Sequence, residues 1–189
     1  MNTMPVAQRM TAEEYMALPE LEGRHADLVH GEVVMADPTW RHQTTQVAIV
    51  VAIANWIEAG ERRGAVSSPI DVYVDEHNVY APDVLWFTEE RIPSQKDVRP
   101  QAVPDLAIEV RSPSTWRYDI GAKKAGYERG GVRELWLVDT AADAVLVFRR
   151  SAPDTPGFDV ALELGAEETL TSPLLPGFAL PLDRVFGSS

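Results

Sequence analysis

The chain has 189 residues, of which 17 are lysine or arginine and 29 are aspartate or glutamate, so its formal net charge is −12. This length favours one domain spanning 1–189, and a hydrophobic content of 45% is typical of a globular protein with a buried core. The absence of cysteine excludes disulfide frameworks and thiolate metal sites. The acidic balance excludes a polybasic nucleic-acid coat, but not an enzyme that contacts nucleic acid at one local patch.

No apolar run is long enough to predict a membrane span. The most apolar run, 47–54, has eight residues, whereas a spanning helix needs about 20. The first ten residues carry no secretory pattern. We therefore expect a cytoplasmic protein without membrane attachment.

The first half of the chain predicts two helices separated by a hairpin. In chain order, we expect a short helix over 11–18 that Thr11 caps, and then a β-hairpin over 26–35. The longest helix is expected over 40–61. Its predicted buried stripe consists of Val47, Val50, Val51, Ala54 and Ile57.

The second half predicts several strands and one more helix. The helix is expected over 118–129, because Gly130 and Gly131 end the pattern there. The expected strands are 66–74, 79–87, 105–110, 134–139 and 144–148, with one more after Phe158. This order predicts an α/β (α+β) fold, in which two helices flank a mixed β-sheet with β-hairpins.

Two acids occur in apolar strand contexts. Asp83 directly precedes the run 84–87, and Glu109 lies within 105–110. A buried carboxylate is costly unless it is paired or bound to a cation. Two such acids on neighbouring strands would form the hard-oxygen site that Mg²⁺ or Mn²⁺ prefers. The alternative is that each acid faces solvent on a half-covered sheet.

A lysine follows on the second predicted helix. Asp119, Lys123 and Tyr127 are spaced at i, i+4 and i+8, so they share one helix face. A lysine that reaches the two strand carboxylates would complete the catalytic residues of a phosphodiesterase. The alternative is an ordinary ion pair between Asp119 and Lys123. Tyr127 is expected to serve in helix packing and not in the chemistry.

The order of these pieces resembles a known family. Pro82-Asp83, the run 109–114, Asp119 with Lys123, and the run 131–139 are similar to the Uma2 family of endonuclease-like proteins, also known as a domain of unknown function. That family belongs to the PD-(D/E)XK superfamily. The resemblance extends over nearly the whole chain, and further matches lie at 10–15, 31–35, 41–43 and 172–177. It implies a restriction endonuclease-like fold and a divalent-metal-dependent endonuclease that hydrolyses phosphodiester bonds of DNA.

The resemblance also implies roles for individual residues. Asp83 and Glu109 would bind Mg²⁺ or Mn²⁺, with the Val110 carbonyl as a third ligand. The superfamily places a lysine two residues after the glutamate, but this chain has Arg111 there, which can hold a phosphate and cannot act as a base. Uma2-like sequences are generally apolar at that position, and their lysine lies on the next helix. The lysine role therefore falls to Lys123.

Four further residues are candidates for the site: Glu32, His42, Arg111 and Asp119. Glu32 matches a family glutamate and would be an extra metal ligand or a water-binding acid, with a solvated turn residue as the alternative. His42 matches a family histidine and would contact phosphate or the attacking water, with a structural histidine as the alternative.

The basic residues are concentrated after Glu109. Between positions 111 and 134 there are six basic residues and three acids. The basic residues are Arg111, Arg117, Lys123, Lys124, Arg129 and Arg133. We therefore expect weak and local contact with DNA, and by analogy a homodimer. Two alternatives stay open: a catalytically silent nuclease-fold module for binding or assembly, and a metal-dependent hydrolase of another phosphoester.

Overall fold

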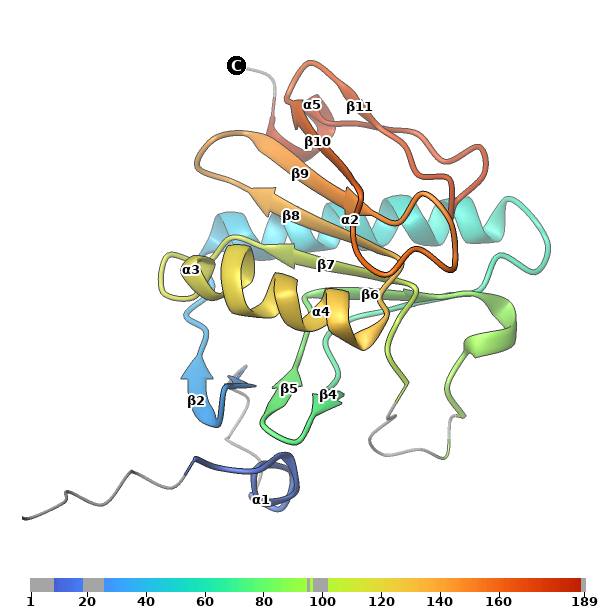
Figure 1. Cartoon of the computed structure of the whole chain (residues 1–189). Coiled ribbons are helices and arrows are strands. Elements are labelled where there is room, and N and C mark those ends of the chain that lie inside the picture. Colours follow the sequence, from blue (N-terminus) through green and yellow to red (C-terminus); the bar gives the residue numbers. More distant parts are fainter. Residues whose placement is uncertain (1–8, 19–25, 95, 97–101, 188–189) are drawn as a thin grey trace, which may run out of the picture.

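The described part of the chain forms β-sheets with helices around them (Figure 1). The computed structural model describes residues 9–18, 26–94, 96 and 102–187. The helical elements are α1 (Ala12–Met16), α2 (Trp40–Glu58), the 3₁₀ turn η1 (Glu89–Arg91), α3 (Trp116–Tyr118), the π-helical segment η2 (Asp119–Lys123), α4 (Lys124–Gly130) and α5 (Asp183–Phe186). The strands are β1 (Ala26–Val29), β2 (Glu32–Met35), β3 (Ala65–Ser67), β4 (Val72–Asp75), β5 (Asn78–Tyr80), β6 (Val84–Phe87), β7 (Leu106–Val110), β8 (Glu134–Asp139), β9 (Ala144–Arg149), β10 (Val160–Gly165), β11 (Thr169–Leu170) and β12 (Leu180–Pro181).

The largest sheet mixes parallel and antiparallel strands. Its six strands lie in the order β10-β9-β8-β7-β6-β3, and β7 with β8 is its parallel pair. A four-stranded sheet has the order β2-β1-β5-β4, and β11 pairs with β12. A parallel pair needs a crossover connection, which α3, η2 and α4 provide. This arrangement confirms the predicted mixed-sheet fold with hairpins.

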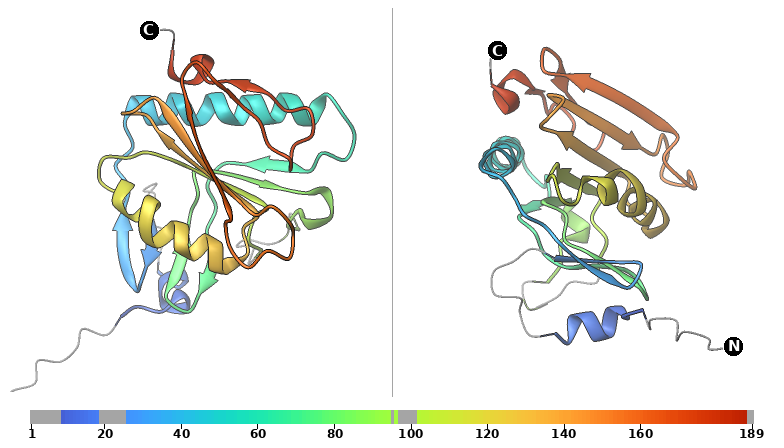
Figure 2. Two further views of the ribbon diagram at one scale, coloured as in Figure 1. Left: turned by 45° about the horizontal axis from the view of Figure 1, so that its top comes forward. Right: turned by 90° about the vertical axis from the view of Figure 1, so that its left-hand side faces the viewer.

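The six-stranded sheet is covered by helices on both faces. Side chains of a strand alternate between the faces, so Ile108 belongs to the core that contains Ile49 and Ile53 of α2, whereas Ala107 belongs to the core that contains Tyr127 of α4. Figure 2 shows α2 and α4 on opposite sides of the sheet. Glu109 shares the face of Ala107 and therefore points toward the crossover helices.

The predicted buried stripe of α2 is partly wrong. Val47 and Val51 are 58% and 50% exposed, and the helix ends at Glu58. The residues that α2 buries are His42, Thr45, Ile49 and Ile53. Apolar side chains occur around much of this helix, and its buried face begins with two polar residues. The spacing of hydrophobic residues alone therefore predicts the wrong face of the helix as the buried one.

Two predicted strands are each divided between the two large sheets. The predicted strand 66–74 separates into β3 and β4, and the predicted strand 79–87 separates into β5 and β6. Pro69 and Pro82 lie at the two divisions. Proline cannot donate to a strand ladder, so the chain leaves one sheet there and joins the other.

The crossover helix differs from the regular helix that its sequence predicts. It begins at Trp116, passes through the π-helical segment η2 and ends at Gly131, whose φ of 88° is left-handed. Glycine adopts that conformation without steric cost. In η2 the wider turn leaves Asp119 and Lys123 buried. The crossover therefore delivers two charged side chains to the interior.

Candidate active site

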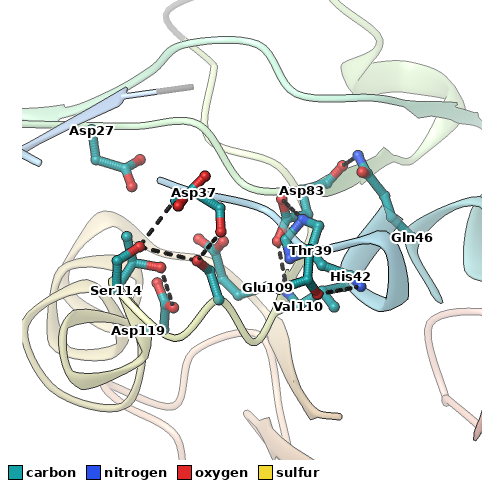
Figure 3. A network of polar contacts seen from close by, with 12 residues as sticks. Asp27, Asp37, Thr39, His42, Gln46, Asp83, Glu109, Val110, Ser114 and Asp119 are labelled. Atoms are coloured by element: carbon teal, nitrogen blue, oxygen red, sulfur yellow. Dashed lines mark hydrogen bonds and ion pairs between the residues drawn. The ribbon is translucent and has the colours of Figure 1, made fainter. Parts of the chain in front are cut away.

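A small cavity lies beside the carboxyl end of β7, between α2, β1 and the crossover helices. Its volume is about 20 Å³, and a water or a bare cation needs roughly 10–15 Å³ on the same measure. Several acids and one lysine line it, and Figure 3 shows most of these residues from close by. The charged and titratable lining residues are Asp27, His42, Asp83, Glu109, Asp119 and Lys123.

Three contacts hold Asp83 in place. Its Oδ2 accepts a hydrogen bond of 2.7 Å from the backbone N–H of Val110, and its Oδ1 lies 3.1 Å from His42 Nε2. Its backbone carbonyl accepts from Gln46 Nε2 at 2.7 Å. Figure 3 shows His42 and Gln46 reaching from α2 toward Asp83. The carboxylate is thus positioned by both a strand and a helix.

His42 is buried in the first turn of α2. The Thr39 hydroxyl caps this helix by accepting from the backbone N–H of His42 at 3.2 Å. Burial lowers the pKa of His42, but the hydrogen bond and the charge of Asp83 outweigh it, so the pKa lies above its usual value. The imidazole is directed at Asp83, and within the described part of the chain its buried Nδ1 has no hydrogen-bond partner.

Glu109 is enclosed by groups from the crossover. Its Oε1 lies 2.7 Å from Lys123 Nζ and accepts a hydrogen bond from the Tyr127 hydroxyl. Its side chain is only 4% exposed. Burial raises the pKa of Glu109 well above its usual value, against the opposing charge of Lys123. This carboxyl therefore keeps its proton to a higher pH than an ordinary glutamate does, even with the Lys123 ammonium beside it.

Lys123 is the cationic centre of the cavity. Its Nζ lies 2.7 Å from Glu109, 2.9 Å from Asp27 and 3.2 Å from Asp119. Burial acts against its charge, but the nearby carboxylates raise the pKa of Lys123 well above its usual value. With Asp83, four carboxylates surround one ammonium group, which leaves three uncompensated negative charges when all are ionised.

Two residues of this network, Asp27 and Tyr127, lie beyond what the sequence pattern predicts for the site. Asp27 lies on β1, where its Oδ1 accepts from the backbone N–H of Ala81 at 2.7 Å. The signal that selected Asp83 and Glu109, an acid next to apolar strand residues, would also have selected Asp27. Tyr127 was interpreted as packing, and its ring does lie edge-on to Tyr80 at 5.2 Å, but its hydroxyl bonds Glu109.

Other candidates lie outside the cavity lining. Glu32 is exposed on β2. Arg111 Nη1 donates to both carboxylate oxygens of Asp139, at 2.8 and 2.9 Å, and its guanidinium lies over the Trp116 ring. The structure thus brings Asp83, Glu109, Lys123, Asp119 and His42 together, whereas it places Glu32 and Arg111 elsewhere.

The donor chemistry of the cavity fits a hard divalent cation. Within the described part of the chain, no group of three or more His, Asp or Glu residues is placed to share a metal. Mg²⁺ does not need such a cage, because it is usually held by one or two carboxylates and keeps several waters. Asp83 and Glu109, in a cavity with an excess of negative charge, fit that mode.

The fold and this site define a class of protein. A mixed sheet flanked by helices, with acids beside the end of a central strand, is the arrangement expected for a restriction endonuclease-like protein. The chain is similar to a solved structure described as "a putative nuclease belonging to DUF820 from Anabaena variabilis", with a TM-score of 0.77 and 19% identity over 94% of this chain and 97% of that chain. This likeness shows the fold.

A match to a family model shows to which protein family the chain belongs. The Uma2 family, described as "Putative restriction endonuclease", matches residues 12–183. The chain belongs to the Uma2 family, which confirms the resemblance seen in its sequence. No curated protein matches the chain. Among the helices of the described residues, none has the length and apolarity that a membrane crossing requires.

Proposed function

We propose that the chain is a divalent-metal-dependent endonuclease that hydrolyses phosphodiester bonds of DNA. The observation that carries this proposal is the convergence of Asp83, Glu109 and Lys123 on one small cavity. Membership of a family described as restriction endonucleases supports it. The two acids supply the oxygen ligands, and the lysine supplies the fixed positive charge, that phosphodiester hydrolysis uses.

The proposed metal would be Mg²⁺ or Mn²⁺. Asp83 and Glu109 would hold it, with the Val110 carbonyl as the third protein ligand. Bound there, the ion would supply Lewis-acid polarisation of the phosphate and lower the pKa of a water. Its charge would also favour the ionised form of Glu109, whose burial otherwise raises its pKa.

The protein side chains divide the remaining work. Lys123 stays protonated, because its pKa lies well above the usual value, so it acts as a fixed charge and not as a general base. This charge would stabilise the negative charge that develops on the phosphate in the transition state. His42 and the Val110 N–H orient Asp83, while Tyr127 and Lys123 orient Glu109.

The proposed DNA contact lies on the crossover segment that follows Glu109. Several of its basic residues reach the surface, and among them Arg129 has a side-chain exposure of 55%. Arg117 lies over the Tyr118 ring, which gives a flat and positively charged surface. A duplex has two strands to cut, so we propose that two copies of the chain act together as a homodimer.

Cleavage of plasmid DNA in Mg²⁺, Mn²⁺ and EDTA tests the proposal. We expect metal-dependent cleavage by the wild type, and a loss of about a hundredfold or more in Asp83→Asn, Glu109→Gln and Lys123→Met. Glu163→Gln, on the exposed edge of β10, is the matched control and should cut normally. Equal cleavage by all five proteins would reveal a contaminating nuclease and exclude the assignment.

One observation favours a second candidate function, a catalytically silent module for binding or assembly. Lys123 already pairs with Glu109, and the cavity of about 20 Å³ has little room beyond a single ion. Calorimetric titration with Mn²⁺ separates the two cases. A saturable isotherm that Glu109→Gln abolishes supports the endonuclease, whereas no binding by the wild type supports the silent module.

The substrate class needs its own comparison. Duplex DNA, single-stranded DNA, RNA and bis(p-nitrophenyl) phosphate can be offered in parallel under the conditions of the plasmid assay. The proposal predicts that duplex DNA is cut fastest. Cleavage of the small diester without cleavage of any nucleic acid would instead identify a hydrolase of another phosphoester.

A further inference from the structure

A second cavity lies at the opposite end of β8 from the candidate active site. β8 begins at Glu134, beside this cavity, and runs toward Asp139 at the other end of the sheet, as its arrow in Figure 1 shows. The cavity has a volume of about 120 Å³. It is bounded by the start of β8, the end of β9 and the segment at Pro173. Its charged lining residues are Arg133, Glu134, Arg149 and Arg150.

Arg149 has almost no partner among the described residues. Its side chain is 14% exposed, and its Nε is buried without a hydrogen bond. Glu134 Oε2 lies 4.0 Å from Nε, which is too far for a hydrogen bond. A buried guanidinium donor without an acceptor is unfavourable. An acceptor from outside the chain, a water or an anion, would satisfy this donor.

Glu134 does not hydrogen-bond Arg149, because its carboxylate is held by other donors at a distance of 4.0 Å from Arg149 Nε. Oε1 accepts from Trp136 Nε1 at 2.6 Å, and Oε2 accepts from the Ser172 hydroxyl at 2.8 Å. Glu134 and Arg149 are cross-strand partners of β8 and β9, so they lie on the same face of the sheet. Glu134 thus offers Arg149 its charge, but no hydrogen bond.

The other two arginines add positive charge around the cavity. Arg133 Nη1 lies 3.5 Å from Asp105 Oδ1, but Asp105 is already bound by Arg91 and by the N–H of Thr88. Arg133 is therefore weakly engaged, and its side chain is 36% exposed. Arg150 donates to backbone carbonyls, Val132 among them at 3.0 Å, which fixes its charge in place. Three guanidinium groups thus surround one carboxylate, in a chain whose formal net charge is −12.

We propose that this cavity, the arginine pocket, binds one oxyanion of the phosphate class between Arg149 and Arg133. Guanidinium groups match the oxygens of phosphate in bidentate geometry. Pockets for drug-sized ligands have about 300–1,000 Å³, so a cavity of about 120 Å³ takes a single group and not a whole nucleotide. The oxyanion is either free phosphate or a phosphodiester of a nucleic-acid backbone.

Thermal unfolding in increasing phosphate, against chloride at matched ionic strength, tests the pocket. Phosphate raises the unfolding temperature of any protein a little through its exclusion from the surface, without saturating. A bound anion adds a saturable increase. We expect the saturable increase in the wild type and in Arg62→Gln, a control in an exposed ion pair with Glu90 that does not line the pocket.

The variants of the pocket give the decisive comparison. Arg149→Met and Arg133→Gln should each weaken phosphate binding about tenfold or more, and Glu134→Gln should strengthen it. Arg133→Gln changes a partly exposed residue, so it remains informative if Arg149→Met folds poorly. A wild type without a saturable increase, or one that both arginine variants retain in full, would overturn the proposal.

A duplex oligonucleotide distinguishes the two sources of the anion. Its binding is followed by fluorescence anisotropy in EDTA, where the candidate metal site is not involved. If the pocket holds a backbone phosphate, Arg149→Met weakens duplex binding and free phosphate competes with the duplex. If the pocket holds a free anion, duplex binding is unchanged while phosphate binding is lost. Either outcome supports the pocket, and neither depends on the proposed endonuclease activity.

Discussion

Lys123 supplies the positive charge that offsets the carboxylates of the candidate site. Its side chain is 3% exposed, and its ammonium group lies within 3.2 Å of three carboxylates from three different elements. An ion pair of this kind contributes little net stability compared with apolar packing, but removal of one partner leaves buried charges uncompensated. The lysine is therefore a structural requirement of this cluster, and under the proposed function it is a catalytic one as well.

We predict that Lys123→Met lowers the free energy of unfolding by about 3–5 kcal/mol at pH 7. The loss should be smaller at pH 5, because the pKa values of Glu109 and Asp119 are raised by burial and these groups take up protons. Urea unfolding at the two pH values measures the difference, with the exposed Arg129→Met as the control. A loss of equal size at both pH values would contradict this electrostatic account.

Glu109 should lower the free energy of unfolding at high pH. Its pKa in the folded chain lies well above the 4.5 of an ordinary glutamate, so the folded chain keeps a proton that the unfolded chain releases. Stability is then lost as the pH rises from 4.5 toward the raised pKa. We predict that Glu109→Gln is more stable than the wild type at pH 8 and equally stable near pH 4.

Urea unfolding without metal measures this effect of Glu109→Gln. Mg²⁺ should reduce the difference in free energy of unfolding between the variant and the wild type at pH 8, because a bound cation stabilises the ionised wild type. Asp143→Asn, an acid on the exposed turn after β8, serves as the control. A Glu109→Gln variant that is less stable than the wild type at pH 8 would show that the carboxylate is stabilised by its partners.

The sequence predicts the two acids of the site better than it predicts the residues that contact the site from elsewhere in the chain. An acid beside apolar strand residues is a strong local signal, and it selects Asp83 and Glu109. Asp27 meets Lys123 across 96 residues of sequence, so its partner is visible only after folding. Arg111 shows the converse, because its family position suggests a site residue whereas it pairs with Asp139.

At the scale of elements, the crossover connects the fold to the site. A π-helical turn contains one more residue than an α-helical turn and often occurs at functional positions. Here it carries both Asp119 and Lys123. Single-sequence periodicity assumes a regular helix, so it predicts one helix over 118–129 and misses this local widening.

Two glycines of the crossover provide a matched test of its packing. A Cβ at Gly121 would meet open space, whereas a Cβ at Gly126 would lie 2.4 Å from the Tyr80 hydroxyl. We predict that Gly121→Ala raises the free energy of unfolding by about 0.5–1 kcal/mol. Gly126→Ala should lower it by about 1–3 kcal/mol, because α4 must move away from β5.

Equilibrium unfolding in urea compares both glycine variants with the wild type. Because both positions lie in one continuous helical stretch, helix propensity alone predicts the same sign for the two substitutions. Opposite signs therefore report the close approach of α4 to Tyr80. Stabilisation by Gly126→Ala would show that this approach is looser than 2.4 Å implies.

For the whole molecule, charge governs the proposed contact with DNA. A formal net charge of −12 opposes binding, so only the local basic surface of the crossover and the arginine pocket favour it. We predict weak binding that falls steeply with salt. In a plot of log affinity against log salt concentration, Arg117→Gln and Arg129→Gln should each reduce the slope by about 0.9 if the residue contacts one phosphate.

Fluorescence anisotropy with a labelled duplex in Ca²⁺ measures these slopes, and Arg62→Gln is the control for a distant arginine. An unchanged slope in both crossover variants would place the DNA contact elsewhere on the molecule.

The same sequence reasoning that predicts this surface also predicts the mixed sheet. It does not predict the second sheet, because pairing between distant strands depends on contacts that no local window contains.

The parallel pairing of β7 with β8 has a consequence for how the site forms during folding. The crossover that joins these strands also links Glu109 to Lys123, so that half of the site can assemble within one local unit. Asp83 is 27 residues from Val110, so its pairing spans about the same length of chain as the pairing of β7 with β8, whereas Asp27 is 96 residues from Lys123 and joins through long-range pairing. We therefore expect a partly folded chain to bring its lysine and glutamate together before Asp27 reaches them. If cleavage follows the proposed chemistry, it would therefore depend on the last of these contacts, and a chain that lacks the Asp27 contact would cut poorly.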